Sequence, residues 1–334
     1  GVHAGCGLAA GDLLDGTHGG RHQGAGTATM ATKVIASDER LCSWQLRVFG
    51  LLWGAYASYY LCRVNFAVAQ PLILREFPAW SSAQIGTIPS IYAATYAAGQ
   101  IVNATLGERY GARRLMTGAL LIAAASNLLF AFASSLNEMR VLWAINGWGQ
   151  SAGWSLMIQT ISNWNTSARR GTLIGRLSTC YQVGNVVSWL LAGALCDAVG
   201  WRTAFLVPGL FLLPMALAFF IFLRDSPMEA GFPPVRDDVG PETAQRVHSE
   251  PSSPLSAGWA STWQILRLTL SNRILWVLAS GCFVVNAVRY SFMNWSVQYM
   301  ADFHGRSIKN SVLTAIVIPL AGSLGALSAG WASD

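Results

Sequence analysis

The sequence predicts an all-α membrane protein, and three observations support this fold class. The chain is 53% hydrophobic and only 11% charged, whereas soluble domains carry about 25% charged residues. Its mean hydropathy is +0.39. Apolar stretches long enough to cross a bilayer as helices recur along the chain between short polar loops. We therefore expect an integral multi-pass protein in a lipid bilayer, with the plasma membrane, the endoplasmic reticulum and another organelle all open as its location.

The order of polar and apolar runs divides the chain into four parts. Residues 1–46 are rich in Gly, Ala and Thr without an apolar period, which predicts a disordered cytosolic tail. Six spans are expected to form an amino-terminal half over residues 47–223, and two more begin a second half over residues 271–334. The expected spans are Val48–Ala69, Ile85–Leu106, Leu115–Asn137, Val141–Trp164, Leu177–Cys196, Thr203–Leu223, Ile274–Met300 and Asn310–Ser333.

Residues 224–270 are expected to form a polar linker between the two groups of spans, because they contain six prolines and few apolar runs. Basic residues orient the molecule, since cytosolic loops of membrane proteins are rich in Lys and Arg. Such residues follow the second span (Arg109, Arg113, Arg114) and the fourth span (Arg169, Arg170, Arg176). This pattern places the amino terminus and the linker in the cytosol.

Two arginines isolated inside apolar spans are the strongest functional candidates. Arg63 is the only charged residue of the first span, and Arg289 is the only one of the seventh. An arginine at mid-membrane costs about 2.5–3.5 kcal/mol on insertion scales, so it is kept where it faces a protein interior or a water-filled cavity. Every Asp and Glu lies outside the spans or at their ends. Cations without an acid partner favour an anionic ligand.

The two arginines also indicate an internal repeat. Arg63 and Arg289 each begin an Arg-x-x-Phe pattern. Glu108 follows Arg63 by 45 residues, and Asp334 follows Arg289 at the same spacing. Parallel half-repeats with a binding site between them are a known transporter design, and chance alignment of a short motif is the alternative.

Tyrosines precede the first arginine at helical spacing. Tyr56, together with Tyr59 or Tyr60, is expected on the helix face that bears Arg63. Their hydroxyl groups would suit phosphate oxygens. Simple packing is the alternative role for each of them.

Several classes of function find no support in the sequence. No G-x-x-x-x-G-K-[ST] loop, buried carboxylate pair or His-based nucleophile set occurs, so neither an ATP-driven pump nor an enzyme is expected, and no cofactor is implied. The net charge is +6, but no basic stripe with interleaved aromatics suggests nucleic-acid binding. No Asp, Glu or His lies inside a span as a proton relay, which favours exchange of one anion for another.

Five segments match, in order and spacing, the motifs of one known family. They are Tyr56–Ala67, Ala104–Arg114, Asn146–Trp154, Arg224–Pro234 and Arg289–Tyr299. Together they resemble the organophosphate:phosphate antiporters of the major facilitator superfamily, over about residues 45–334. The resemblance implies a twelve-helix fold of which about eight helices are present here, with truncation after the eighth, acting as a monomer.

The resemblance also implies roles for individual residues. Substrate phosphate would be held between Arg63 and Arg289. Further residues expected to line the cavity are Tyr60, Tyr56, Tyr96, Trp154 and Gln182, and those of the conformational loop motif are Glu108, Arg109, Arg113 and the repeat counterpart Asp334.

The implied function is exchange of glycerol-3-phosphate or a hexose phosphate for inorganic phosphate by alternating access. Three positions depart from the bacterial members, which have histidine at Gln182, lysine at Gln100 and tyrosine at Asn286. These departures leave open the organic part of the substrate. Two alternatives remain, namely a carrier of another anion within the same superfamily and a sugar-phosphate sensor that binds without transport.

Overall fold

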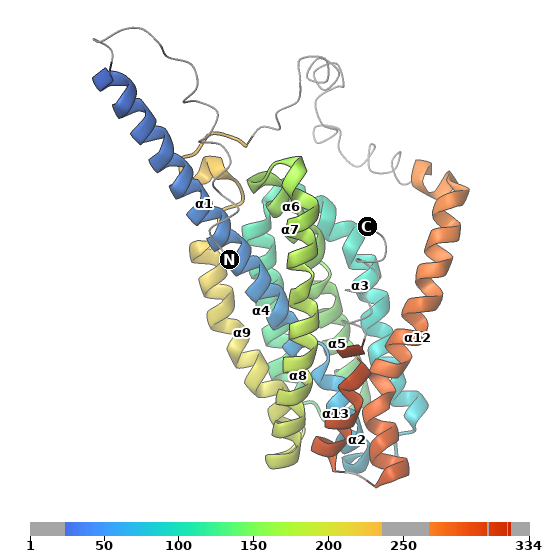
Figure 1. The fold of residues 1–334 in the computed structure, drawn as a ribbon. Coiled ribbons are helices and arrows are strands. Elements are labelled where there is room, and N and C mark those ends of the chain that lie inside the picture. Colours follow the sequence, from blue (N-terminus) through green and yellow to red (C-terminus); the bar gives the residue numbers. More distant parts are fainter. Residues whose placement is uncertain (1–23, 236–266, 306, 319, 322–334) are drawn as a thin grey trace.

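Figure 1 shows the chain as a bundle of long helices in a computed structural model. The structure describes residues 24–235, 267–305, 307–318 and 320–321. All regular elements in these ranges are helical, which confirms the predicted all-α class.

The larger group of helices corresponds to the predicted amino-terminal half. It contains α1 (Gly24–Leu61), α2 (Asn65–Glu76), α3 (Ser82–Tyr110), α4 (Ala112–Phe130), α5 (Leu136–Gln150), α6 (Gly153–Trp164), α7 (Ser167–Leu177), α8 (Thr179–Ala198) and α9 (Thr203–Phe222). The short 3-10 helix η2 (Pro227–Ala230), α12 (Arg273–His304) and α13 (Ile308–Ala315) follow. The second, third and sixth predicted spans are single helices. The fifth is also a single helix apart from its first residue, which ends α7, and the first and fourth each consist of two helices in succession.

The amino-terminal region differs from the expectation. A disordered tail was expected over residues 1–46, whereas α1 begins at Gly24. The segment from Lys33 to Arg47 contains no Gly or Pro, the two residues with the lowest helix propensity. Residues 1–23 lie outside the described part of the chain.

Local sequence signals explain where several helices begin. Ser81 and Gln84 form a capping box at the start of α3. Ser135 and Glu138 form another at the start of α5. In each, the serine hydroxyl accepts from a backbone N–H that has no partner inside the helix, and the Gln or Glu side chain accepts from the backbone N–H of the serine.

Small residues allow helices of the larger group to approach closely. A Cβ atom at Gly147 of α5 would lie 2.6 Å from the Tyr92 carbonyl oxygen of α3. A Cβ atom at Gly184 of α8 would lie 2.8 Å from the Ala57 carbonyl oxygen of α1. Larger side chains would therefore separate these helix pairs, as expected for membrane helix packing.

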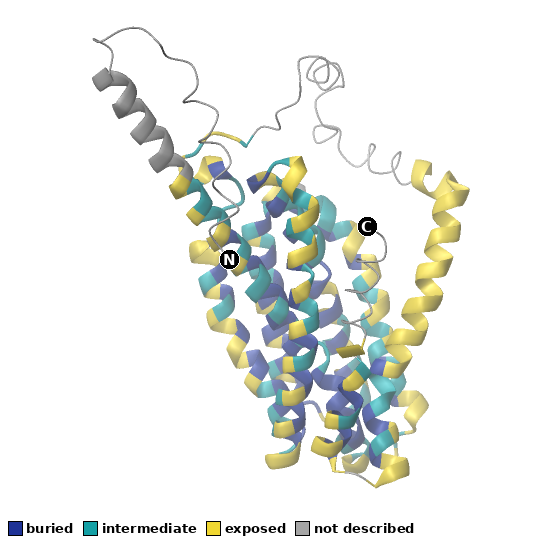
Figure 2. Cartoon of the chain, in the orientation of Figure 1, coloured by how far each residue is buried: buried dark blue, intermediate teal, exposed yellow. Residues whose placement is uncertain are grey.

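The helices α12 and α13 join the larger group at one end only. α12 packs against α2 and α13, and α13 packs against α8. The buried residues of α12 lie in its second half, at Met293, Val297, Gln298 and Ala301. Residues 273–292 are exposed, and Figure 2 shows this half of α12 apart from the bundle. The two groups of helices thus meet at one end and diverge at the other.

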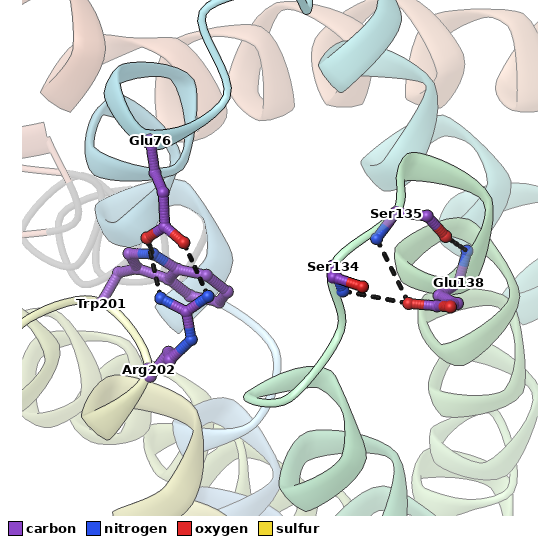
Figure 3. A network of polar contacts seen from close by, with 6 residues as sticks. All are labelled: Glu76, Ser134, Ser135, Glu138, Trp201 and Arg202. Carbon is purple, nitrogen blue, oxygen red and sulfur yellow. Dashed lines mark hydrogen bonds and ion pairs between the residues drawn. The ribbon is translucent and has the colours of Figure 1, made fainter.

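The two ends of the bundle differ in their charged residues. Where α12 diverges, Arg113 and Arg114 of α4 and Arg224, which follows α9, line one surface cavity with Asp225 and Glu229. At the opposite end, Figure 3 shows Glu76 paired with Arg202 and Glu138 capping α5. The loop after the second span and the segment after the sixth therefore lie together at one end of the bundle.

Two described helices are long and apolar enough by themselves to cross a membrane. They are α9, with a mean hydropathy of 2.4, and α12, with 1.4. The paired helices α5–α6 and α1–α2 are interrupted, and α3 and α8 carry interior Asn, Gln and Ser side chains that lower their mean hydropathy. The polar groups that lower this hydropathy include those that build the site described next.

Candidate functional site: a cavity between the two helix groups

The first predicted span is broken beside its arginine. α1 ends at Leu61 and α2 begins at Asn65. In a continuous helix the Phe66 N–H would donate to the carbonyl of Cys62. It donates instead to Asn65 Oδ1 at 3.0 Å. The Cys62 carbonyl, which is buried, therefore needs donors from elsewhere in the fold.

Three buried amide side chains supply these donors. Asn127 Nδ2 of α4 lies 3.2 Å from the Cys62 carbonyl oxygen. Asn146 Nδ2 and Gln150 Nε2 of α5 lie 2.8 Å and 3.2 Å from the same oxygen. Gln150 Nε2 also donates to Asn146 Oδ1 at 2.9 Å. This network satisfies the interrupted backbone, so the break is a stable feature of the packed bundle.

The same glutamine orients Arg63. Arg63 Nε donates to Gln150 Oε1 at 3.0 Å, and the Tyr92 hydroxyl donates to that oxygen at 3.2 Å. The guanidinium carbon lies 4.8 Å from the ring centre of Tyr60, 4.9 Å from that of Tyr96 and 5.8 Å from that of Tyr92. Aromatic faces favour a cation at such distances. Arg63 is therefore held in one orientation by α1, α3 and α5.

One nitrogen of Arg63 remains without a partner. Nη2 is buried and has no hydrogen bond within the part of the chain that the structure describes. A buried charged donor left unpaired is costly. This nitrogen marks the direction in which an anion would be bound.

The cavity beside Arg63 has a volume of about 410 Å³ and lies between the larger helix group and α12. Pockets for small molecules usually enclose about 300–1,000 Å³. Both Arg63 and Arg289 line it, together with Tyr60, Tyr92 and Tyr96. The two isolated cations that the sequence singles out thus face one common space.

Arg289 has a much looser environment than Arg63. It lies on the exposed half of α12, and its guanidinium carbon lies 5.9 Å from the ring centre of Tyr181 on α8. Within the described residues, neither Arg289 nor Arg63 forms an ion pair with an acid. Two cations at one cavity repel each other unless an anion lies between them.

The structure brings together four of the seven expected substrate-binding residues, Arg63, Arg289, Tyr60 and Tyr96, around the cavity. Tyr56, Trp154 and Gln182 are not among its lining residues. Tyr56 is buried against Trp154, with ring centres 5.6 Å apart. Gln182 is half-buried on α8.

Other residues of the site were not expected from the sequence. They are the amide network around Cys62 and, on the cavity wall, Asn185 and Trp189 of α8. A usable signal existed for α5, because Asn146 and Gln150 are polar, four residues apart and inside an apolar span. A single asparagine and tryptophan in α8 give no comparable signal.

The loop motif lies away from this cavity, at the arginine-rich end. The Arg113 backbone N–H donates to Asp225 Oδ1 at 2.7 Å, and its Nε donates to the Phe220 carbonyl at 2.6 Å. Burial raises the pKa of Asp225 above its ordinary value. Arg109 is exposed beside Tyr110. The side chain of Glu108 and all of Asp334 lie outside the described part of the chain.

Gly111 is required where this loop turns. Its φ is +81°, a left-handed conformation that side chains disfavour. A Cβ atom there would lie 2.3 Å from Asp225 Oδ2. The glycine therefore lets the loop approach the segment that follows α9.

Comparisons with known proteins agree with this architecture. The family model of the Major Facilitator Superfamily matches residues 52–334. A crystal structure of a bacterial homologue of the human lysosomal transporter Spinster aligns with a TM-score of 0.68 at 19% identity, over 84% of this chain and 60% of that one. This likeness, together with the family match, confirms the predicted fold class.

Curated relatives resemble the chain over most of its length. A probable hexose phosphate transport protein of Chlamydia muridarum is 29% identical over 87% of this chain and 64% of its own length. The membrane sensor protein UhpC of Salmonella typhimurium is 28% identical, covering 92% and 68%. The glycerol-3-phosphate transporter of Bacillus subtilis is 26% identical, covering 91% and 67%. The chain thus spans about two thirds of the length of these relatives, which confirm the resemblance to organophosphate antiporters.

Proposed function

The chain belongs to the major facilitator superfamily, and from this premise we propose that it is a secondary transporter that exchanges an organophosphate for inorganic phosphate by alternating access. It is an integral membrane protein, as members of this superfamily are. Glycerol-3-phosphate and hexose phosphates are the proposed organic substrates, in line with the names of its relatives. We propose that it acts as a monomer, because the cavity lies between helices of one chain.

The observation that supports this proposal is a pair of arginines at one cavity that have no acid partner among the described residues. A phosphate group has several oxygens that can accept from both guanidinium groups at once. Bound phosphate would also give Arg63 Nη2 the partner that it lacks among the described residues. Binding and charge neutralisation would then occur together.

The packing of α12 supports alternating access. Gln70 of α2 donates a hydrogen bond to Gln298 of α12, and both side chains are buried where the helix groups meet. The other half of α12, nearer the arginine-rich end of the bundle, is exposed, so the two helix groups lie apart there. Rocking of one helix group against the other would close this end and open the opposite one.

The lining of the cavity supports exchange over proton coupling. Its described lining residues contain no Asp, Glu or His. Proton-coupled carriers use such groups inside the membrane as relays. Exchange of two phosphate-bearing ligands at the same pair of arginines needs none of them.

Counterflow in proteoliposomes tests the proposal. Full-length protein would be reconstituted with internal phosphate, and uptake of labelled phosphate would be measured with glycerol-3-phosphate, glucose-6-phosphate or an organic sulfonate as competitor. We expect organophosphates to compete with phosphate and the sulfonate to compete poorly. Phosphate uptake that no organophosphate inhibits would contradict the proposal, and stronger competition by the sulfonate would favour a carrier of another anion.

A sensor is the second candidate, because one relative is named a membrane sensor protein. A sensor of this fold would use the same cavity but would not need to release ligand on the opposite side. Binding of an organophosphate with the expected dependence on Arg63, together with no measurable counterflow, would favour the sensor over the transporter.

A further inference from the structure

The wall of the cavity formed by α8 carries polar atoms that the two arginines do not explain. Asn185 and Trp189 both line the cavity, and their side chains are 1% and 0% exposed. Asn185 Oδ1 and Trp189 Nε1 have no hydrogen-bond partner among the described residues. Because buried polar atoms are normally paired, such atoms at a cavity indicate where a ligand makes its bonds.

The chemistry of this pair differs from that of the arginines. Asn185 and Trp189 are four residues apart on α8, so they lie on one face of the helix. The asparagine oxygen accepts a hydrogen bond, and the indole N–H donates one. An unprotonated phosphate oxygen would be repelled by the asparagine oxygen, whereas a hydroxyl group can donate to it and accept from Trp189.

Aromatic surfaces beside this pair suit a carbon skeleton. Trp143 of α5 and Trp295 of α12 line the cavity together with Trp189. Inorganic phosphate has no C–H surface to place against such rings. A ligand that fills this part of the cavity therefore combines C–H groups with hydroxyl groups.

We propose that Asn185 and Trp189 bind a hydroxyl group of the organic part of the substrate while Arg63 and Arg289 bind its phosphate. This assignment rests on the proposed function and attributes the preference for hydroxylated phosphate esters over simple alkyl phosphates to two residues of α8. It also changes which residue of α8 is expected to determine substrate specificity. The sequence comparison drew attention to Gln182, but Asn185, nearly one turn later, is the amide that lines the cavity.

The test compares ligands that differ only in hydroxyl groups. Full-length protein in detergent would be titrated with inorganic phosphate, propyl phosphate, glycerol-3-phosphate and glucose-6-phosphate, using wild type, Asn185→Leu and Trp189→Phe. We expect wild type to bind at least one hydroxylated ester roughly five- to tenfold more tightly than propyl phosphate, and each variant to lose most of that preference. Affinity for inorganic phosphate should change less than about twofold.

Trp201→Phe is the matched control. It removes an indole N–H that donates to Glu76 Oε2 at 2.7 Å, at the end of the bundle away from the arginine-rich loops. All four affinities should stay unchanged in this variant.

The possible outcomes separate the two proposals. Equal losses for all four ligands in the α8 variants would indicate a structural role for Asn185 and Trp189 and overturn the inference. The wild-type titration decides the matter even if a variant does not fold, because equal affinity for propyl phosphate and both hydroxylated esters also overturns it. Absence of phosphate binding by wild type would instead remove the proposed function and this inference together.

Discussion

Arg63 and Arg289 face one cavity, but the protein holds them in different ways. Arg63 donates to Gln150 at 3.0 Å and lies against three tyrosine rings. Arg289 is exposed on α12 and lies near the single ring of Tyr181. The larger helix group thus fixes the orientation of Arg63. The second arginine depends on where α12 lies.

This difference suits a site that must open and close. The groups around Arg63 all come from α1, α3 and α5, so its position does not depend on α12. Arg289 belongs to a helix that packs at one end only. We infer that Arg63 is the fixed part of the phosphate site and that Arg289 completes it when the helix groups approach each other around the ligand.

The largest expected effect comes from replacing the arginines themselves. Lysine keeps the charge but lacks the planar fork that donates to two oxygens. Arg63→Lys and Arg289→Lys should each weaken phosphate binding by about 1.5–3 kcal/mol, or roughly tenfold or more. Arg63→Lys should have the larger effect, because lysine cannot donate to Gln150 and to phosphate through one rigid group. Equilibrium titration of the full-length variants with phosphate measures both effects.

Near-normal phosphate affinity in both lysine variants would eliminate the phosphate site proposed here. If the arginines served only to hold helices together, the variants would lose thermal stability in detergent while binding phosphate normally when folded. Equal effects at the two positions would contradict the distinction between a fixed and a mobile arginine.

A second, smaller effect is expected when the environment of Arg63 is broken and the arginine is kept. Gln150→Leu removes the acceptor of Arg63 Nε and one of the donors to the Cys62 carbonyl. Buried groups left unpaired cost about 1–3 kcal/mol, so the free energy of unfolding should fall within that range. Phosphate affinity should fall as well, because Arg63 would lose its fixed orientation. Thermal unfolding in detergent, with and without phosphate, measures both changes.

The matched control is Gln182→Leu, at a half-buried amide on α8 that does not line the cavity. It should change stability by no more than about 0.5 kcal/mol, as is usual for positions away from a buried network. A loss equal to that of Gln150→Leu would show that any amide in the bundle has the same effect.

The sequence predicts the two arginines better than it predicts the helix break beside Arg63. A lone arginine in an apolar span is conspicuous in any hydropathy pattern, so both cations could be found without a structure. The break at Cys62–Val64 could not, because no proline or glycine occurs there. Its cause lies in amides of α4 and α5 that are 65 to 88 residues away along the chain. Such long-range pairing is not visible in local periodicity.

Tertiary packing also decides which tyrosines reach the cavity. A continuous helix would place Tyr56, Tyr60 and Arg63 along one face. In the structure Arg63 lies beyond the end of α1, Tyr60 lines the cavity and Tyr56 is buried against Trp154. Helix period therefore identified the correct region, but the identity of the lining residues depended on tertiary packing.

The smallest expected effect concerns Arg202, which pairs with the acid Glu76. This pair is a reference for Arg63 and Arg289, which have no acid partner among the described residues. Glu76 accepts from Arg202 at 2.6 Å and from Trp201 Nε1 at 2.7 Å (Figure 3). The hydrogen bond from Arg202, aided by that from Trp201, holds the pKa of Glu76 below its ordinary value near 4.5. A carboxylate with a lowered folded pKa adds stability above its unfolded pKa and loses it as the pH falls through the folded pKa. Because both side chains are more than a third exposed, solvent screening limits this contribution to about 0.2–1 kcal/mol.

The thermal stability of wild type should therefore fall slightly more below about pH 4.5 than the thermal stability of Glu76→Gln. The capping carboxylate Glu138, whose pKa is lowered by the N–H groups of Ser134 and Ser135, remains in both proteins and cancels in the difference. Identical pH profiles for the two proteins would show that the paired arginine contributes nothing measurable to stability, and phosphate affinity should be the same in both because Glu76 does not line the cavity.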